Sequence, residues 1–135
     1  MINWLRLDQP IGCADNLGPL QLAWVGDAVW ELHQRLQYSK RPGRTMDMHL
    51  SVVAEVHASA QASALQRLEP YLSEMEKDLV RRGRNKAGRG PRNRDAATYG
   101  RATGFETMIG WLFLKDPERL LQLLGRLDEE KTNQQ

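Results

Sequence analysis

The strongest constraint in this 135-residue sequence is the spacing of its apolar residues, which recur every three or four positions along most of the chain. That spacing is typical of α-helices with one buried face, and no segment shows the strict alternation that indicates a half-buried strand. The first run follows Pro19, which fits the first turn of a helix, and predicts a helix over residues 19–37. Its predicted inward face consists of Leu22, Val25, Val29, Leu32 and Leu36. The sequence therefore predicts an all-α fold, a helical bundle.

The same pattern places further helices along the rest of the chain. They are expected over residues 46–68 with Thr45 as cap, from 69 to a C-terminal cap at Gly83, in a short segment after Asp95, over 103–114, and from 116 onward. Residues 81–94 are rich in glycine and arginine and lack an apolar period, so we expect a basic loop there. The length suits one domain, which we assign to residues 1–127, followed by a polar tail over 128–135.

Several classes of protein are disfavoured by simple counts. The single cysteine, Cys13, cannot form an internal disulfide, so the sequence does not indicate a secreted, disulfide-bonded fold. The longest apolar stretch, residues 108–114, contains Gly110 and is too short to span a bilayer. The N-terminus lacks the basic and apolar regions of a signal peptide. We therefore expect a cytoplasmic protein without membrane association.

Charge is distributed very unevenly along the chain. The formal net charge is only +2, but residues 81–101 contain eight basic residues and one acid, Asp95, and so carry +7. Arginine dominates this stretch, and its planar guanidinium suits bidentate contact with phosphate. The pattern favours a nucleic-acid-binding segment over a loop that charge merely keeps soluble. The candidate contact residues are Arg81, Arg82, Arg84, Lys86, Arg89, Arg92 and Arg94.

Two acidic residues stand in apolar helical surroundings. Asp27 lies in the first helix, where little surface is left for water, and Glu106 begins a second apolar run. A lone carboxylate in such a place is most simply satisfied by an arginine or by backbone amides. The neighbouring glycines, Gly26, Gly104 and Gly110, instead suggest a close helix crossing that would bring the two carboxylates together. Converging carboxylates need a cation between them, and Mg²⁺ is a hard ion that such oxygen ligands hold.

Other side chains that often carry chemistry give no comparable signal. The histidines follow no zinc-binding spacing, and we interpret them as packing or surface residues: His33, His49 and His57. Three of the four tryptophans lie within apolar helical runs. We interpret the tryptophans as core residues rather than as platforms for stacked bases: Trp4, Trp24, Trp30 and Trp111.

Three segments together resemble one known family. Residues 23–31, Ala-Trp-Val-Gly-Asp-Ala-Val-Trp-Glu, resemble the signature helix of ribonuclease III domains, and residues 102–114 resemble that family's second acidic helix. With Arg82-Gly-Arg-Asn-Lys86, they resemble the short form of the family, Mini-ribonuclease III, over most of the chain. The resemblance implies an all-α endonuclease domain that forms homodimers, binds double-stranded RNA and cuts both strands using Mg²⁺. It also implies precursor 23S ribosomal RNA as the leading substrate.

The resemblance assigns roles to individual residues. Asp27 matches the family's catalytic aspartate, and Glu106 matches the metal-binding glutamate of the second helix. Further acids of full-length ribonuclease III are replaced here by Leu20, Ala23 and Thr103. The short form of the family has the same smaller number of acidic residues in its site. A site with fewer acidic ligands implies more bound water and weaker Mg²⁺ binding.

The resulting hypothesis is hydrolysis of RNA phosphodiester bonds by a water that Mg²⁺ activates, leaving 5′-phosphate and 3′-hydroxyl ends. The basic loop would hold the duplex, and a two-fold dimer, with Trp111 and Phe113 as candidates for its interface, would cut both strands. The missing acids favour one alternative, a degenerate domain that binds structured RNA without cutting it. A second alternative, a helical protein-binding adaptor, leaves the placement of both acids unexplained. Nothing in the residues indicates whether a ribosomal protein assists.

Overall fold

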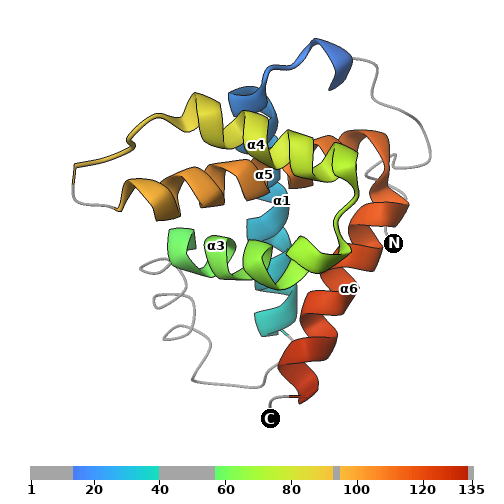
Figure 1. The fold of residues 1–135 in the computed structure, drawn as a ribbon. Helices are drawn as coiled ribbons and strands as arrows, with labels where there is room; N and C mark the ends of the chain where they lie inside the picture. Colours follow the sequence, from blue (N-terminus) through green and yellow to red (C-terminus); the bar gives the residue numbers. More distant parts are fainter. Residues whose placement is uncertain (1–13, 40–56, 93–94, 134–135) are drawn as a thin grey trace.

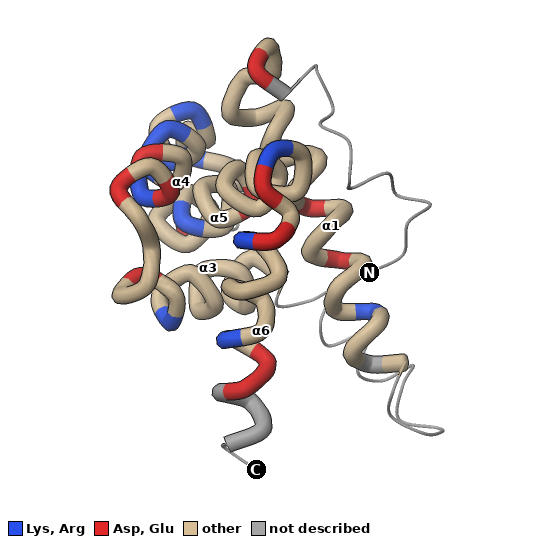
Figure 2. The backbone as a smooth tube through the Cα atoms, turned by 90° about the vertical axis from the view of Figure 1, so that its right-hand side faces the viewer, with Lys and Arg blue, Asp and Glu red and all other residues tan. Residues whose placement is uncertain are grey.

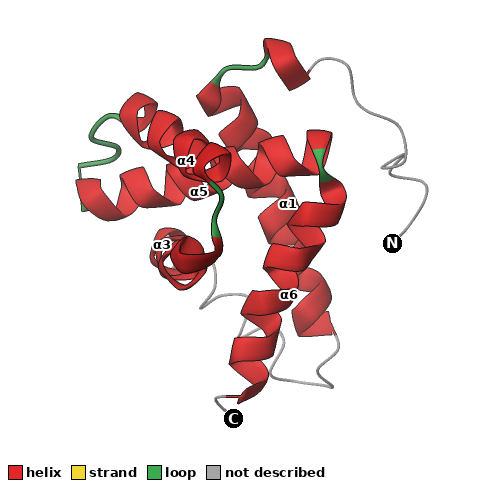
Figure 3. Ribbon diagram, turned by 45° about the vertical axis from the view of Figure 1, so that its right-hand side comes forward, coloured by secondary structure: helices red, strands yellow, loops and turns green. Residues whose placement is uncertain are grey.

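The computed structural model describes residues 14–39, 57–92 and 95–133. Within these ranges the chain is helical and contains no strand, as Figure 3 shows, which confirms the predicted all-α fold. The α-helices are α1 (Pro19–Ser39), α3 (His57–Leu68), α4 (Glu74–Ala87), α5 (Ala96–Lys115) and α6 (Pro117–Asn133), with short 3₁₀ helices at Ala14–Asn16 and Glu69–Tyr71. None of the helices in the described ranges is long and apolar enough to cross a membrane.

Helix α5 lies at the centre of the fold (Figure 1). Eleven of its twenty residues are buried, and α1, α3, α4 and α6 all contact it. Its fully buried side chains include Phe105, Met108, Ile109 and Leu112. Burying each large apolar side chain contributes about 1.5–3 kcal/mol, so packing on α5 decides where the other helices lie. The core is completed by Trp30, Leu65, Leu68, Leu79, Val80, Leu120, Leu123, Leu124 and Leu127.

Two glycines let α1 and α5 cross with their backbones in contact. A Cβ atom at Gly26 would overlap the backbone carbonyl of Glu106, and a Cβ atom at Gly110 would overlap the carbonyl of Leu22. Any side chain at either position would push the two helices apart, because neither carbonyl has room to move within a packed core. The close crossing that the glycines suggested is therefore present in the structure.

The buried face of α1 differs from the predicted one. Leu22 is buried as expected, but Leu32 and Leu36 are 43% and 50% exposed, and Val25 and Val29 are only partly buried. The face that packs on α5 is centred on a glycine rather than on large apolar residues. The buried residues of α1 whose side chains the structure describes are Leu22, Ala23, Gly26, Trp30 and Gln34. Counting apolar residues missed this face because the closest helix contact is made by the smallest residue.

The basic segment is largely helical, which corrects the loop predicted over residues 81–94. Gly83 does not cap a helix, because it packs against α5, where an added Cβ would overlap Thr107 and Gly104. Helix α4 instead continues to Ala87 and ends at Gly88, whose φ of 65° lies in the left-handed region that glycine favours. Arg94 lies outside the described residues.

Helix α4 also begins later than predicted, because residues 69–71 form a separate 3₁₀ turn. Ser73 caps the helix: its hydroxyl accepts a hydrogen bond from the Glu76 N–H at 3.2 Å, and the Glu76 carboxylate accepts one from the Ser73 N–H at 2.8 Å. The buried Glu76 carboxylate also accepts two hydrogen bonds from the Arg119 guanidinium, at 2.8 and 2.9 Å. This ion pair ties the start of α4 to α6.

Three other boundaries depart from the sequence prediction. Asp95 caps a helix as expected, through a 3.3 Å hydrogen bond from the Thr98 N–H, but one continuous helix, α5, replaces the two predicted after it. Helix α6 runs through most of the predicted tail, and Asp128 lies 3.2 Å from the His33 ring on α1. The predicted helix over 46–68 appears as α3 from residue 57, while its earlier part, Thr45, His49, Trp4 and Cys13 lie outside the described residues.

Candidate active site

Asp27 lies on α1 beside the glycine that contacts α5. Its backbone is thus held in the tightest helix contact of the fold, while its side chain remains 44% exposed. A substrate from solvent can therefore reach the carboxylate without any rearrangement of α1. The sequence placed Asp27 in apolar surroundings, and the structure shows that the helix turns this residue to the edge of the core.

Glu106 lies on α5 at the same crossing, and the structure brings its carboxylate close to that of Asp27. A third residue, His57 at the start of α3, completes the cluster. One potential ligand atom from each of these three partly buried side chains lies within 4.8 Å of the other two. Three separate helices therefore deliver two carboxylates and one imidazole to one place.

His57 was interpreted from the sequence as a packing or surface residue, and this interpretation is wrong. Its Nε2 atom lies 2.8 Å from Oδ1 of Asp27. Gln61, one helical turn later, is only 1% exposed, and its Nε2 atom lies 2.9 Å from Nε2 of His57. A four-residue spacing places both side chains on one face of α3. That spacing was visible in the sequence, but only the packing of α3 against α5 shows that the face points at the acids.

The two carboxyl groups differ in their affinity for protons. Burial raises the pKa of Glu106, and the neighbouring charge and hydrogen bond of Asp27 raise it further, to about 8. Burial alone would also raise the pKa of Asp27, but hydrogen bonds with Glu106, His57 and Gln61 outweigh that effect and lower it. At neutral pH the site without a cation therefore contains an ionised Asp27 next to a protonated Glu106.

These side chains fit a divalent cation. Carboxylate oxygens are the ligands that Mg²⁺ prefers, and one or two of them with several waters make a typical Mg²⁺ site. Burial and the neighbouring Asp27 both raise the pKa of Glu106, so ionising this second carboxyl group is unfavourable without a compensating charge. A cation would replace the proton of Glu106 and balance both carboxylates.

The described basic residues of the predicted loop lie on α4 and the turn after it, and Figure 2 marks lysine and arginine positions in blue along the backbone. All of them that the structure describes are exposed: Arg81, Arg82, Arg84, Lys86, Arg89 and Arg92. Arg81 pairs with Asp78 one turn earlier on α4. Arg81, Arg82, Arg84 and Lys86 lie on α4, which packs on α5, so helical geometry fixes the spacing of these four residues, whereas Arg89 and Arg92 follow the end of the helix.

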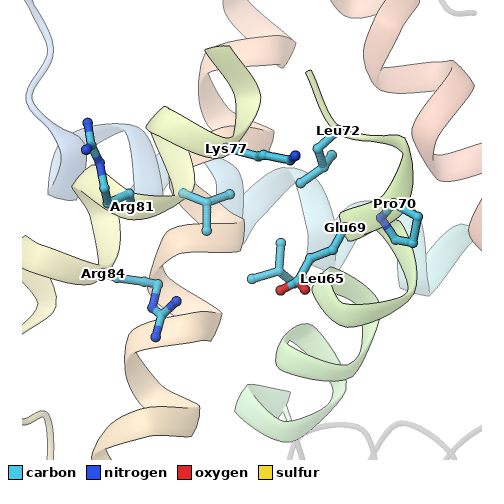
Figure 4. Close-up of a pocket in the computed structure, with 8 residues that line it drawn as sticks. Leu65, Glu69, Pro70, Leu72, Lys77, Arg81 and Arg84 are labelled. Atoms are coloured by element: carbon cyan, nitrogen blue, oxygen red, sulfur yellow. The ribbon is translucent and has the colours of Figure 1, made fainter. Parts of the chain in front are cut away.

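Helical geometry divides these basic residues between two sides of α4. Arg81 and Arg84 line a groove of about 450 Å³ between α4 and the end of α3, which Figure 4 shows with Lys77 on the same helix and Glu69 opposite. Arg82 lines a smaller hollow on the other side of α4, next to the start of α1. The sequence predicted one basic loop that holds RNA, whereas the structure has basic residues on two sides of α4.

An apolar stripe on α1 faces away from the core. Five residues spaced four apart form it, and all are exposed: Leu20, Trp24, Ala28, Leu32 and Leu36. Trp24 was predicted to be buried, yet it is 80% exposed. The stripe borders an open groove of about 550 Å³ that Phe113 of α5 also lines. Trp30 is buried as predicted, whereas Trp111 is only partly buried.

Comparison with known proteins decides the family. Residues 20–117 match the ribonuclease III domain. The chain belongs to the ribonuclease III family. It is 46% identical over 114 residues to the Mini-ribonuclease 3 of a Synechococcus species, an alignment that covers 84% of this chain and 83% of that protein. It is 49% identical over 108 residues to the Mini-ribonuclease 3 of Gloeobacter violaceus, covering 80% of each protein.

A solved structure has the same fold. The crystal structure of a protein from Fusobacterium nucleatum superimposes with a TM-score of 0.71 at 28% identity, covering 84% of this chain and 93% of that chain. Together these similarities place the chain in the short form of the ribonuclease III family, as its motifs predicted, and identify it as an endoribonuclease.

The structure also shows how the positions that carry further acids in full-length ribonuclease III are used here. Thr103 is buried, and its hydroxyl donates to the backbone carbonyl of Tyr99 at 3.0 Å. Ala23 is buried in the contact with α5, and Leu20 belongs to the exposed apolar stripe. None of these three side chains offers a carboxylate, so Asp27 and Glu106 are the acids of the described cluster.

Proposed function

We propose that this endoribonuclease cleaves double-stranded RNA with Mg²⁺ held by Asp27 and Glu106. The observation that carries the proposal is the meeting of these two carboxylates where α1 crosses α5, at a place open to solvent. Membership of the ribonuclease III family supports duplex RNA as the substrate. The named relatives favour cleavage over the alternative of a degenerate RNA-binding domain.

The chain's own residues perform distinct tasks in this reaction. Asp27 supplies a carboxylate that is already ionised at neutral pH, and Glu106 supplies a second one after it releases its proton. Mg²⁺ bound there supplies a Lewis acid that activates a water and offsets the charge that develops on the scissile phosphate. The glycine contact between α1 and α5 keeps both carboxylates in place, so little reorganisation accompanies the chemical step.

The exposed basic faces of α4 supply the grip on the duplex. A-form RNA is recognised largely by its shape, through phosphates and 2′-hydroxyls. Arg82, Arg84 and Lys86 are exposed and form no ion pair with another described residue, so their charged groups are available to phosphates. Arg81, Arg89, Arg92 and Arg94 add further cations to this RNA-binding segment. The resemblance to the short form supports precursor 23S ribosomal RNA in the cytoplasm as the substrate.

A homodimer would use the apolar stripe of α1. Exposed apolar surface of this extent marks an interaction site, and a second copy presents the same stripe for a two-fold contact. Two copies would bring two sites to the two strands. Replacing Trp24 by Glu would place a charge in the stripe and yield a monomer in size-exclusion chromatography with light scattering. Met75→Glu, which alters an exposed apolar residue on α4 (46% exposed), outside the stripe, would leave the dimer intact.

The decisive test is cleavage of a long RNA duplex with and without Mg²⁺. Asp27→Asn removes a charge without changing shape, so cleavage should fall at least about 100-fold while duplex binding survives. Glu118→Gln, an exposed acid on α6, serves as the matched control and should cut like the wild type. Wild-type protein that binds the duplex but never cuts it would instead support the RNA-binding alternative.

A further inference from the structure

A nitrogen atom stands among the oxygen ligands of the acidic site. Nε2 of His57 approaches Oδ1 of Asp27 at 2.8 Å, and a ring nitrogen of His57 lies within 4.8 Å of a carboxylate oxygen of Glu106. Two ligand atoms on opposite sides of a cation with bonds of about 2.1–2.4 Å are separated by about 4.2–4.8 Å. The three atoms therefore already lie within the span of a single coordination shell.

The packing of α3 in the core fixes the position of the His57 imidazole. Helix α3 is anchored by Ala64, Leu65 and Leu68, which are 0–1% exposed. Gln61 lies one turn after His57, is 1% exposed, and its Nε2 atom lies 2.9 Å from Nε2 of His57. The side of α3 that carries His57 and Gln61 therefore faces the acidic cluster.

A nitrogen ligand changes which ions such a site prefers. Mg²⁺ strongly prefers oxygen ligands and releases its waters reluctantly. Divalent ions of the first transition series accept imidazole more readily, and among them Mn²⁺ adopts the same octahedral geometry as Mg²⁺. A comparison of Mn²⁺ with Mg²⁺ therefore isolates the contribution of the nitrogen, because the coordination geometry stays the same.

We propose that His57 is a metal ligand that makes this site select Mn²⁺ over Mg²⁺. The inference rests on the proposed function, because it concerns the same site, but it adds a third ligand and an ion preference. Asp27 and Glu106 bind either ion through oxygen, and His57 adds a bond that strengthens only the binding of Mn²⁺. The enzyme then cleaves RNA with either ion and reaches half-maximal rate at a lower concentration of Mn²⁺.

Direct binding measurements test this proposal without relying on activity. Isothermal titration calorimetry at one fixed pH gives the Kd of each ion, and the free Mn²⁺ signal in electron paramagnetic resonance gives an independent value. In the wild type we expect Mn²⁺ to bind at least about tenfold more tightly than Mg²⁺. His57→Ala should reduce that ratio to near one, mainly by weakening Mn²⁺ binding.

Two further variants make the test specific. His57→Asp replaces the nitrogen ligand by an oxygen ligand. Mg²⁺ binding should therefore be stronger than in His57→Ala, while the preference for Mn²⁺ stays lost. If His57→Ala does not fold, His57→Asp alone still tests the proposal. His33→Ala removes a histidine that contacts Asp128 far along α1, and its ion preference should equal that of the wild type. Circular dichroism checks that each variant is folded.

The outcomes separate this inference from the proposed function. An unchanged Mn²⁺ to Mg²⁺ ratio in His57→Ala or His57→Asp overturns the ligand role of His57, even where duplex RNA is still cut. A ratio that collapses in both variants supports the role, even if the wild type cuts no duplex and the proposed function fails. Equal weakening of both ions in His57→Asp would show that His57 only positions Asp27, and would also overturn the proposal.

Discussion

Gly26 of α1 and Glu106 of α5 touch through their backbones, and this contact sets the position of Asp27 relative to the Glu106 carboxylate. Asp27 follows Gly26 directly, so the crossing point of the two helices lies next to both acids. A second contact, between Gly110 and the carbonyl of Leu22, fixes the crossing one turn away. The candidate site is therefore part of the core contact itself and does not depend on a loop.

A methyl group at this crossing should damage both folding and chemistry. In Gly26→Ala the new Cβ would overlap the carbonyl of Glu106, and because backbone must move to relieve it, we expect a loss of about 1–3 kcal/mol in the free energy of unfolding. The two carboxylates would also separate, so cleavage should fall more than the folded fraction does. Urea unfolding and cleavage rates on the folded protein measure the two effects.

Gly125→Ala is the matched control for this experiment. Gly125 lies within α6, and nothing approaches within 4 Å of the position that its Cβ would occupy. The substitution should therefore raise the free energy of unfolding by about 0.5–1 kcal/mol, since alanine loses less conformational freedom in a helix. A Gly26→Ala protein as stable as the wild type would contradict the backbone contact.

The shifted pKa of Glu106 predicts how the stability of the cation-free protein depends on pH. Its pKa is about 8 in the folded protein against an ordinary value of 4.5, so between these values the folded state binds a proton that the unfolded state has released. Stability should fall as pH rises from about 4.5 to 8 and then level off. This loss of stability is the consequence of holding two carboxyl groups close together, one of them buried, without a cation.

Glu106→Gln should remove that cost while abolishing cleavage. The amide has the same shape, carries no charge, and can donate to Asp27, so the variant should be more stable than the wild type by roughly 1–3 kcal/mol above pH 8. The difference should vanish below about pH 4.5, where both forms are neutral. Urea unfolding in the presence of a chelator measures it, and a variant less stable than the wild type at every pH would contradict the protonated state of Glu106.

Sequence patterns predicted the helices well where one face alone is apolar, and they failed where glycine makes the contact. Periodicity gave the extent of α1 almost fully, but it chose the face with Leu32 and Leu36 because glycine adds nothing to an apolar count. Gly83 was assigned as a cap for a related reason. Glycine at a helix end and glycine at a helix crossing look the same in a sequence until the partner helix is known.

The candidate site was predicted in part. Asp27 and Glu106 were identifiable because an acid in an apolar helix is costly and needs a reason. His57 was not, because a histidine on an alanine-rich helix carries no such cost, and its role depends on how α3 packs on α5. Contacts between residues far apart in the sequence decide which polar side chains meet, and local periodicity contains no information about them.

The basic faces of α4 should carry the salt-dependent part of RNA binding. Replacing Arg82, Arg84 and Lys86 by Ala should weaken binding of an RNA duplex to a protein that also carries Asp27→Asn, which prevents cleavage. Each lost phosphate contact lowers the slope of log K against log salt concentration by about one, so the slope should become shallower by up to about three. Filter binding over a series of KCl concentrations measures this change.

A matched control separates this effect from overall charge. Arg126→Ala removes a cation on α6 whose guanidinium stacks on Tyr71 at 3.9 Å and which is not one of the basic residues of α4. If the loss of α4 contacts is specific, this variant keeps the wild-type slope and affinity. Because Arg82 lies on one side of α4 and Arg84 on the other, the single variants also show which face meets the duplex. An unchanged slope in the triple variant would remove α4 from the RNA-binding surface.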